Sequence, residues 1–300
     1  MRRRVIKQGN NTLTITLPRK WTEQRSIKAG DELDVDETGA ELRIHPGGAP
    51  LASDKTIDLK DAEFAAARVL TQCYKQGYAN VHLVFSSPKV ARALQDEVRK
   101  TLMTYEVLNV TRTSCTVQSL SQERPEDFDM MLRKVFQVTI AMAENGLEQL
   151  SQGKVDGLEE IASLEGANNR FTAFCHRIIS QHGYKSPNKA TVMYTVIWQL
   201  EKIADELKFL LQHVARTQTK ITKSQSDNLK EAIKMLQLLY AYFYKPEMDT
   251  LHSVTTLRKS LTNRINAEFG RKGDVKIDHH TLVITEKVFD LSGPLIALTL

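Results

Sequence analysis

The chain has 300 residues, of which 41% are hydrophobic and 26% are charged, the balance of a globular protein with two or three domains. This composition excludes a disordered or fibrous protein, and no apolar run is long enough to predict a membrane span. Gly9-Asn10-Asn11 interrupts the basic start of the chain, so no signal peptide is expected. The cysteines lack the spacing of a metal or disulfide site, which favours a cytoplasmic protein.

The net charge of +5 is distributed unevenly along the chain. Residues 1–28 contain eight Lys and Arg residues and one acidic residue, Glu23, so this segment carries +7 and the remaining 272 residues carry −2. A short basic segment indicates an anionic partner, with nucleic acid the first candidate and a solvated basic arm the alternative. The cations expected to contact DNA are Arg2, Arg3, Arg4, Lys7, Arg19, Lys20 and Arg25.

Residues 1–46 predict two β-hairpins around a short helix. Apolar residues alternate with threonines over residues 12–17, a turn at 9–11 joins this strand to one at 3–8, and Pro18 can open the helix. A second hairpin is expected about a turn at residues 36–39. A unit of this size has too little core to fold alone, so we expect two copies to share one. The residues of that core would be Leu13, Ile15, Leu17, Leu33, Val35, Leu42 and Ile44.

These residues, in this order, resemble the AbrB/MazE/SpoVT swapped-hairpin family. The resemblance covers the whole segment and is carried by three runs, Leu13-x-Ile15-x-Leu17-Pro18-Arg19-x-Trp21, Ile27-x-x-Gly30-Asp31-x-Leu33-x-Val35 and Leu42-x-Ile44-x-Pro46. It implies an intertwined homodimer whose basic face binds DNA, often in a transcriptional regulator.

Residues 46–53 have the composition of a linker, and residues 54–120 predict a small α/β domain. Strands are expected at 56–59, 80–85, 106–111 and 114–118, and helices at 62–76 and 88–103. We identify no catalytic constellation here. His82 lies within a predicted strand and is better explained as a packed or surface residue than as a ligand.

Residues 126–300 predict six helices in two groups of three. Apolar residues recur at helical spacing over 130–150, 158–179, 190–214, 229–243, 254–269 and 282–298. Short connections make neighbouring helices antiparallel, so each group should form a bundle. The expected fold is a multidomain α+β protein with an N-terminal swapped-hairpin β domain (1–46), a small α/β domain (54–120) and a pair of three-helix bundles (126–300).

The third and sixth predicted helices each carry a Glu-x-x-x-Asp pair, Glu201/Asp205 and Glu286/Asp290. Spacing of four residues places both carboxylates on one helical face, where like charges cost a few tenths of a kcal/mol unless they are compensated. Repeated oxygen ligands suit a hard or borderline cation that bridges helices. The alternative is a solvated acidic face neutralised by neighbouring lysines, which are Lys202, Lys208 and Lys287.

Two three-helix bundles with this motif in their last helices resemble PhoU, the phosphate-uptake regulator, and residues 77–81 are similar to an insert of archaeal PhoU-like regulators. The resemblance implies metal ions bound by these four carboxylates, with Glu165 of the second helix as a further ligand. The chain departs from the family at Asn169, where an amide replaces a carboxylate, and the fifth helix has no clear match. All segments together resemble the archaeal AbrB–PhoU fusion regulators.

Two functional hypotheses follow. The first is a DNA-binding transcriptional regulator linked to phosphate uptake or homeostasis, with a helical sensing domain. The alternative is a signalling adaptor whose bundles bind phosphate-transport or sensor proteins and whose N-terminal domain only dimerises. An enzyme is not expected, because the sequence lacks a Gly-rich phosphate loop, a Ser/His/Asp order and an HExxH motif. His279 and His280, expected just before the sixth helix, could ligate metal but are better explained by a surface turn.

Overall fold

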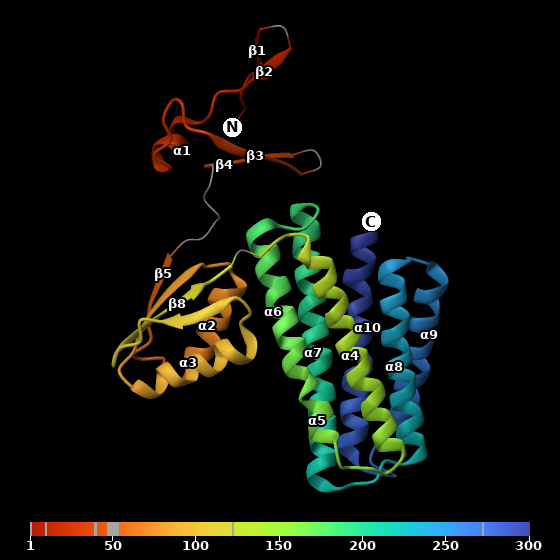
Figure 1. Ribbon diagram of the computed structural model, residues 1–300. Coiled ribbons are helices and arrows are strands. Elements are labelled where there is room, and N and C mark those ends of the chain that lie inside the picture. The colour runs from red at the N-terminus through yellow and green to blue at the C-terminus, as the bar shows by residue number, and fades with distance from the viewer. Residues whose placement is uncertain (1, 10, 39–40, 47–53, 122, 272) are drawn as a thin grey trace. The chain divides into compact units, whose positions relative to one another are not determined.

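The computed structural model describes residues 2–9, 11–38, 41–46, 54–121, 123–271 and 273–300 (Figure 1). The chain divides into two compact units, residues 1–50 and 51–300, which are described separately. Among the described residues, no helix is long and apolar enough to cross a membrane.

The first unit contains the two expected hairpins and the helix between them. Strand β1 (Ile6–Gln8) pairs with β2 (Thr12–Thr14), helix α1 (Arg19–Gln24) follows Pro18, and β3 (Leu33–Thr38) pairs with β4 (Glu41–Pro46). The predicted second turn at 36–39 is wrong in position, because pairing continues to Thr38 opposite Glu41. The predicted linker at 46–53 falls, after Pro46, outside the described residues.

One copy of this unit has no buried core among its described side chains. Leu13 is 69% exposed and Leu42 is 64% exposed, and Ile15 and Val35 are also largely accessible. Leu17, Leu33 and Ile44 are only half-buried. In a single chain, the seven apolar residues expected in a core therefore remain accessible, and a second chain could cover them.

The second unit begins with a four-stranded sheet in the order β5-β6-β8-β7. Strands β5 and β6 are parallel, and the other neighbours are antiparallel. Helices α2 and α3 pack on the sheet through Leu70 and Leu94, which meet the inward side chains of β6 and β8. The bounds are β5 (Asp54–Asp58), a 3₁₀ turn η1 (Glu63–Ala65), α2 (Ala66–Lys75), β6 (Asn80–Val84), α3 (Pro88–Thr101), β7 (Tyr105–Leu108) and β8 (Ser114–Ser119).

The rest of the second unit is helical, with the six expected helices present and the second one divided at Ser163. Apolar faces of both groups of three meet in one continuous core rather than in two separate bundles. The bounds are α4 (Asp127–Ser151), α5 (Leu158–Ala162), α6 (Leu164–His182), α7 (Pro187–Thr217), α8 (Lys223–Tyr244), α9 (Met248–Glu268) and α10 (Val275–Thr299).

Helices α7 and α10, the last helix of each group, run antiparallel and pack against each other within this core. The ammonium group of Lys287 donates to the backbone carbonyl of Lys202 at 3.3 Å, and these two lysines are 85 residues apart, the same interval that separates the two Glu-x-x-x-Asp pairs. The equivalent helices of the two groups therefore meet at equivalent residues.

A buried arginine connects the sheet region to the helices. The Arg177 guanidinium of α6 lies 4.8 Å from the ring centroid of Tyr74 and 5.0 Å from that of Tyr105. Its Nε donates to Glu123 at 2.7 Å, and its Nη1 donates to the carbonyls of Tyr74 and Tyr78 at 3.1 and 2.8 Å. Arg177 and Glu123 are both about 1% exposed, so each charge depends on the other and on these hydrogen bonds.

Replacing Arg177 with Met should lower the free energy of unfolding by about 3–5 kcal/mol, because it leaves the Glu123 carboxylate buried without its counter-ion. Urea unfolding of the full chain measures the change. The matched control is Arg124→Ala, which removes an exposed pair with Asp127 and should change stability by less than about 0.5 kcal/mol. A loss below about 1 kcal/mol for R177M would contradict this role.

Candidate functional site

All seven basic residues predicted to contact DNA are exposed in the first unit. Arg19 pairs with Glu23 at 2.8 Å across one turn of α1, but this pair lies at the surface and is worth at most about 1 kcal/mol. The Arg19 guanidinium therefore remains available to a phosphate group.

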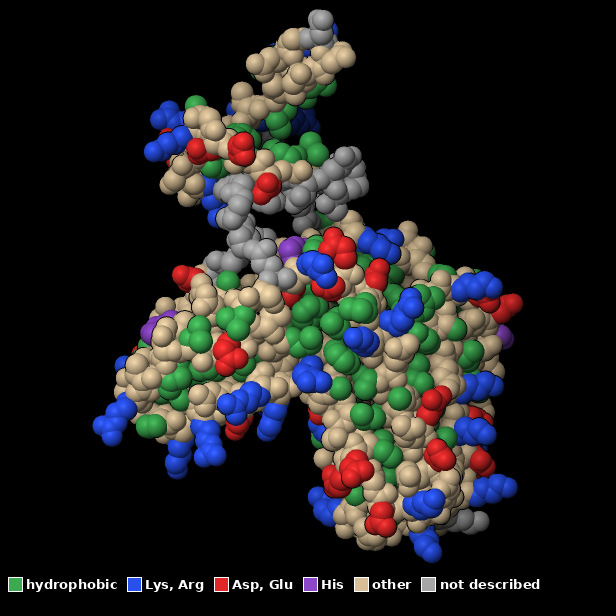
Figure 2. Space-filling model, viewed as in Figure 1, with side chains coloured by type: hydrophobic (Ala, Val, Ile, Leu, Met, Phe, Trp, Pro, Cys, Tyr) green, Lys and Arg blue, Asp and Glu red, His purple; other side chains and the backbone are tan. Residues whose placement is uncertain are grey.

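A second basic surface lies on α3 in the other unit. Figure 2 shows Lys and Arg side chains projecting along the edge that α3 forms. The exposed cations of this helix are Lys89, Arg92, Arg99 and Lys100. This edge was not identified from the sequence, because its acidic neighbours Asp96 and Glu97 cancel part of the charge.

The first predicted carboxylate pair lies in a cluster of opposite charges. Lys208 Nζ lies 2.8 Å from Glu165 and 3.4 Å from Asp205, and so joins α6 to α7. Asn169 donates to the same Glu165 oxygen at 2.7 Å, so its amide acts as a hydrogen-bond donor to this carboxylate. The structure thus brings Glu165 and Asp205 together around an ammonium group.

Glu201, the other member of this pair, faces α2. Its Oε2 accepts from Lys75 at 3.0 Å, and its Oε1 lies 3.3 Å from Lys202. Burial favours the protonated acid, but the charge and hydrogen bond of Lys75 outweigh it and hold the pKa of Glu201 below its ordinary value. Lys202 also bonds to Asp205 at 2.7 Å. Three carboxylates are therefore matched by three ammonium groups.

The second pair is arranged differently. Glu286 accepts from Arg258 of α9 at 2.8 and 3.2 Å and from the Thr262 hydroxyl at 3.1 Å. Asp290 is exposed one turn further along α10. The two pairs do not form one site, since Glu201 faces the sheet region and Glu286 faces α9.

These contacts favour neutralisation by basic side chains over a cluster of bound cations. A metal ion at Glu165, Asp205 or Glu201 would have to displace a lysine, and one at Glu286 would compete with a guanidinium bonded through two nitrogens. Of the three lysines expected to neutralise the carboxylate pairs, Lys202 and Lys208 contact the first pair. Lys287 binds Glu206 instead. Metal at the four carboxylates stays a prediction.

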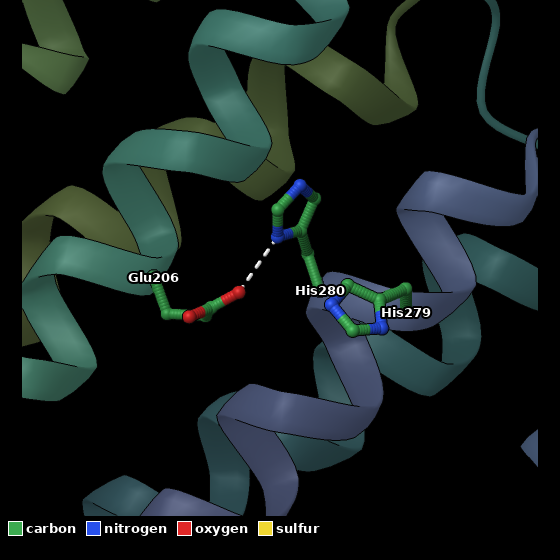
Figure 3. Close-up of side chains that lie close together, drawn as sticks. All are labelled: Glu206, His279 and His280. Atoms are coloured by element: carbon green, nitrogen blue, oxygen red, sulfur yellow. Dashed lines mark hydrogen bonds and ion pairs between the residues drawn. The ribbon is translucent and has the colours of Figure 1, made fainter.

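A further cluster lies between α7 and α10 and contains Glu206, His279 and His280 (Figure 3). Glu206 Oε1 accepts from His280 Nδ1 at 2.7 Å, and Oε2 accepts from Lys287 at 3.0 Å. Burial raises the pKa of Glu206, but these two hydrogen bonds lower it more, so the carboxylate is ionised at neutral pH.

The sequence-based placement of the two histidines is wrong. They lie inside α10 rather than in a turn before it, because the Asp274 side chain accepts the backbone N–H of Lys276 and starts the helix at Val275. Side chains of adjacent residues point about 100° apart around the axis of a helix. Both histidine rings nevertheless lie near Glu206.

Sequence reasoning also missed Glu206 and His213. These residues are seven apart on α7, and Lys287 and His280 are seven apart on α10, a spacing that places each pair on one helical face. His213 Nε2 bonds to Asp274 at 2.7 Å. The matching intervals could have indicated a polar seam between two antiparallel helices, but the partner of each residue depends on the register of packing.

Replacing Lys208 with Met should destabilise the chain by about 1–2 kcal/mol at pH 7, because Glu165 and Asp205 lose the counter-ion they share. Burial raises the pKa of Asp205, but Lys202 and Lys208 lower it more. A carboxylate with a lowered pKa stabilises the fold above its unfolded pKa of about 4 and loses this contribution below it, so the deficit should shrink toward pH 3.

Urea unfolding of both proteins at several pH values tests this expectation. Lys245→Met is the control, because Lys245 is 84% exposed beside Glu247 and should contribute little at any pH. An equal deficit at pH 7 and pH 3 would mean that Lys208 acts through packing alone.

Comparison of the chain with protein-family models, with curated proteins and with solved structures found no match.

Proposed function

We propose that the protein is a DNA-binding transcriptional regulator that acts as a homodimer through residues 1–46. The observation that supports this most directly is that the first unit concentrates positive charge in residues 1–28 but has no buried core among its described side chains. A two-stranded hairpin is marginal in water without an apolar partner, so the unit gains stability by association. The resemblance to swapped-hairpin proteins agrees with this arrangement.

Charge supports DNA as the ligand. A dimer doubles the +7 of residues 1–28, so two copies of this segment would carry an excess of about fourteen positive charges, with the acidic residues of the second hairpin held apart from DNA. Most of these cations would bind phosphates and position the dimer, and one or two would read base edges. Release of counterions makes such binding fall steeply with salt.

The second unit would serve as the sensing part. Its resemblance to PhoU suggests a signal related to phosphate, and its extensive helical core gives it stability independent of the first unit. In the alternative function this unit binds transporter or sensor proteins, and the basic residues of the first unit are not needed for binding.

Replacing Arg19 and Lys20 with Ala should weaken DNA binding and reduce the slope of log K against log salt by about 2–4, because each dimer loses four cations near phosphates. Fluorescence anisotropy with a genomic DNA fragment over a range of salt concentrations measures both quantities. The matched control is Arg99→Ala with Lys100→Ala, which removes the same charge from α3.

An unchanged slope for R19A/K20A with a reduced slope for R99A/K100A would move the DNA site to α3. No salt-dependent binding by the full chain would favour the adaptor function.

Replacing Leu13 with Asp should convert a dimer into a monomer, because a charge at a buried interface position opposes association. Light scattering of the full chain during size-exclusion chromatography gives the mass. Val110→Asp is the control, since Val110 is 46% exposed in the second unit and lies outside the proposed interface. A wild-type monomer at micromolar concentration would contradict the swapped-hairpin assignment, and a dimer that persists in L13D would place its interface elsewhere.

A further inference from the structure

The cluster of Glu206, His279 and His280 has the ligand types of a transition-metal site. One donor atom from each residue lies within 4.8 Å of the donors of the other two. Bonds of about 2.0–2.2 Å in tetrahedral geometry place ligand atoms roughly 3.5 Å apart, so small side-chain rotations would bring the three into range. Figure 3 shows both histidine rings on α10 near the Glu206 side chain, which extends from α7.

The two oxygens of Glu206 have different partners. Lys287 donates to Oε2, and this bond fixes the orientation of the carboxylate, as hydrogen bonds to metal-binding carboxylates commonly do. Oε1 has a partner that a metal ion can replace, since it accepts a hydrogen bond from His280 Nδ1 at 2.7 Å. The Nδ1 proton would move to Nε2 or leave to solvent, and the freed lone pair would bind the ion.

A third histidine, which belongs to α7, lies next to this cluster. His213 is 6% exposed, and its ring centroid lies 6.4 Å from that of His280. Its Nε2 is bonded to Asp274, but its Nδ1 is buried with no hydrogen-bond partner in the described part of the chain. A buried ring nitrogen without a partner is uncommon in native proteins, and this one lies close to the cluster rather than within it.

We propose that Glu206, His279 and His280 form a binding site for a zinc ion, in which Glu206 binds through Oε1 and Lys287 holds the remaining oxygen. Imidazole and carboxylate ligands suit zinc, and three protein ligands leave a fourth position for water. The ion would tie α7 to α10 where the two groups of helices meet. This site shares no residue with the Glu-x-x-x-Asp pairs or with the proposed DNA surface.

Equilibrium dialysis of the full chain against zinc chloride, after treatment with a chelator, tests the proposal. Elemental analysis should find about one zinc ion per chain, whereas an equal concentration of magnesium should not bind. His279→Ala and Glu206→Gln should each weaken zinc binding at least tenfold. His279 is exposed, so H279A tests the site even if E206Q destabilises the fold.

Two controls match these changes. His252→Ala removes an exposed histidine of α9, and Glu286→Gln neutralises a carboxylate of the second predicted pair, and both should bind zinc like the wild type. The proposal is overturned if the wild type binds less than about a tenth of an equivalent, or if H279A and E206Q retain its affinity. Equal losses in H252A would mean surface adsorption, and a loss only in E286Q would assign the metal to the carboxylate pair. DNA binding is measured separately, so its failure would not affect this result.

Discussion

The position of the sheet region depends on a charge that has been removed from water. Arg177 cannot be buried without acceptors for its nitrogens, and those acceptors come from α2, from the loop after it and from Glu123. The bond to the Tyr74 carbonyl fixes the end of α2, and the next residue, Lys75, extends from that point to Glu201 of α7. Arg177 thus holds the end of the helix from which Lys75 reaches Glu201.

Patterns within single elements could be predicted from the sequence, and contacts between elements could not. Apolar periodicity located every strand and helix of the second unit, but the last three helices begin earlier than predicted, α8 and α9 by six residues and α10 by seven. The extension of α10 depends on Asp274, a cap whose effect is local but easily missed when only apolar residues are followed. Lys75 and Glu201 are 126 residues apart, and nothing in either segment indicates that they meet.

The two units obtain stability in different ways. The second buries continuous apolar clusters within one chain, and its partly buried acids are compensated by lysines and arginines from neighbouring helices. The first leaves its apolar side chains accessible, and its residues 1–28 contain one acidic residue beside eight cations. The uneven charge along the sequence already distinguishes the two units. Which base pairs with which acid, in contrast, is visible only in the folded structure.

The meeting of α7 and α10 at Lys202 and Lys287 has a consequence for how the two halves can diverge. When two identical chains pack through the same surface, each substitution occurs on both sides of the symmetry axis. Here the equivalent helices belong to one polypeptide, so one half can acquire a residue while the other keeps its own. Lys202 binds acids of its own helix, whereas Lys287 crosses to Glu206, and the two copies of one motif already serve different neighbours. A single chain can in this way place a specialised site at only one of two similar sequence motifs.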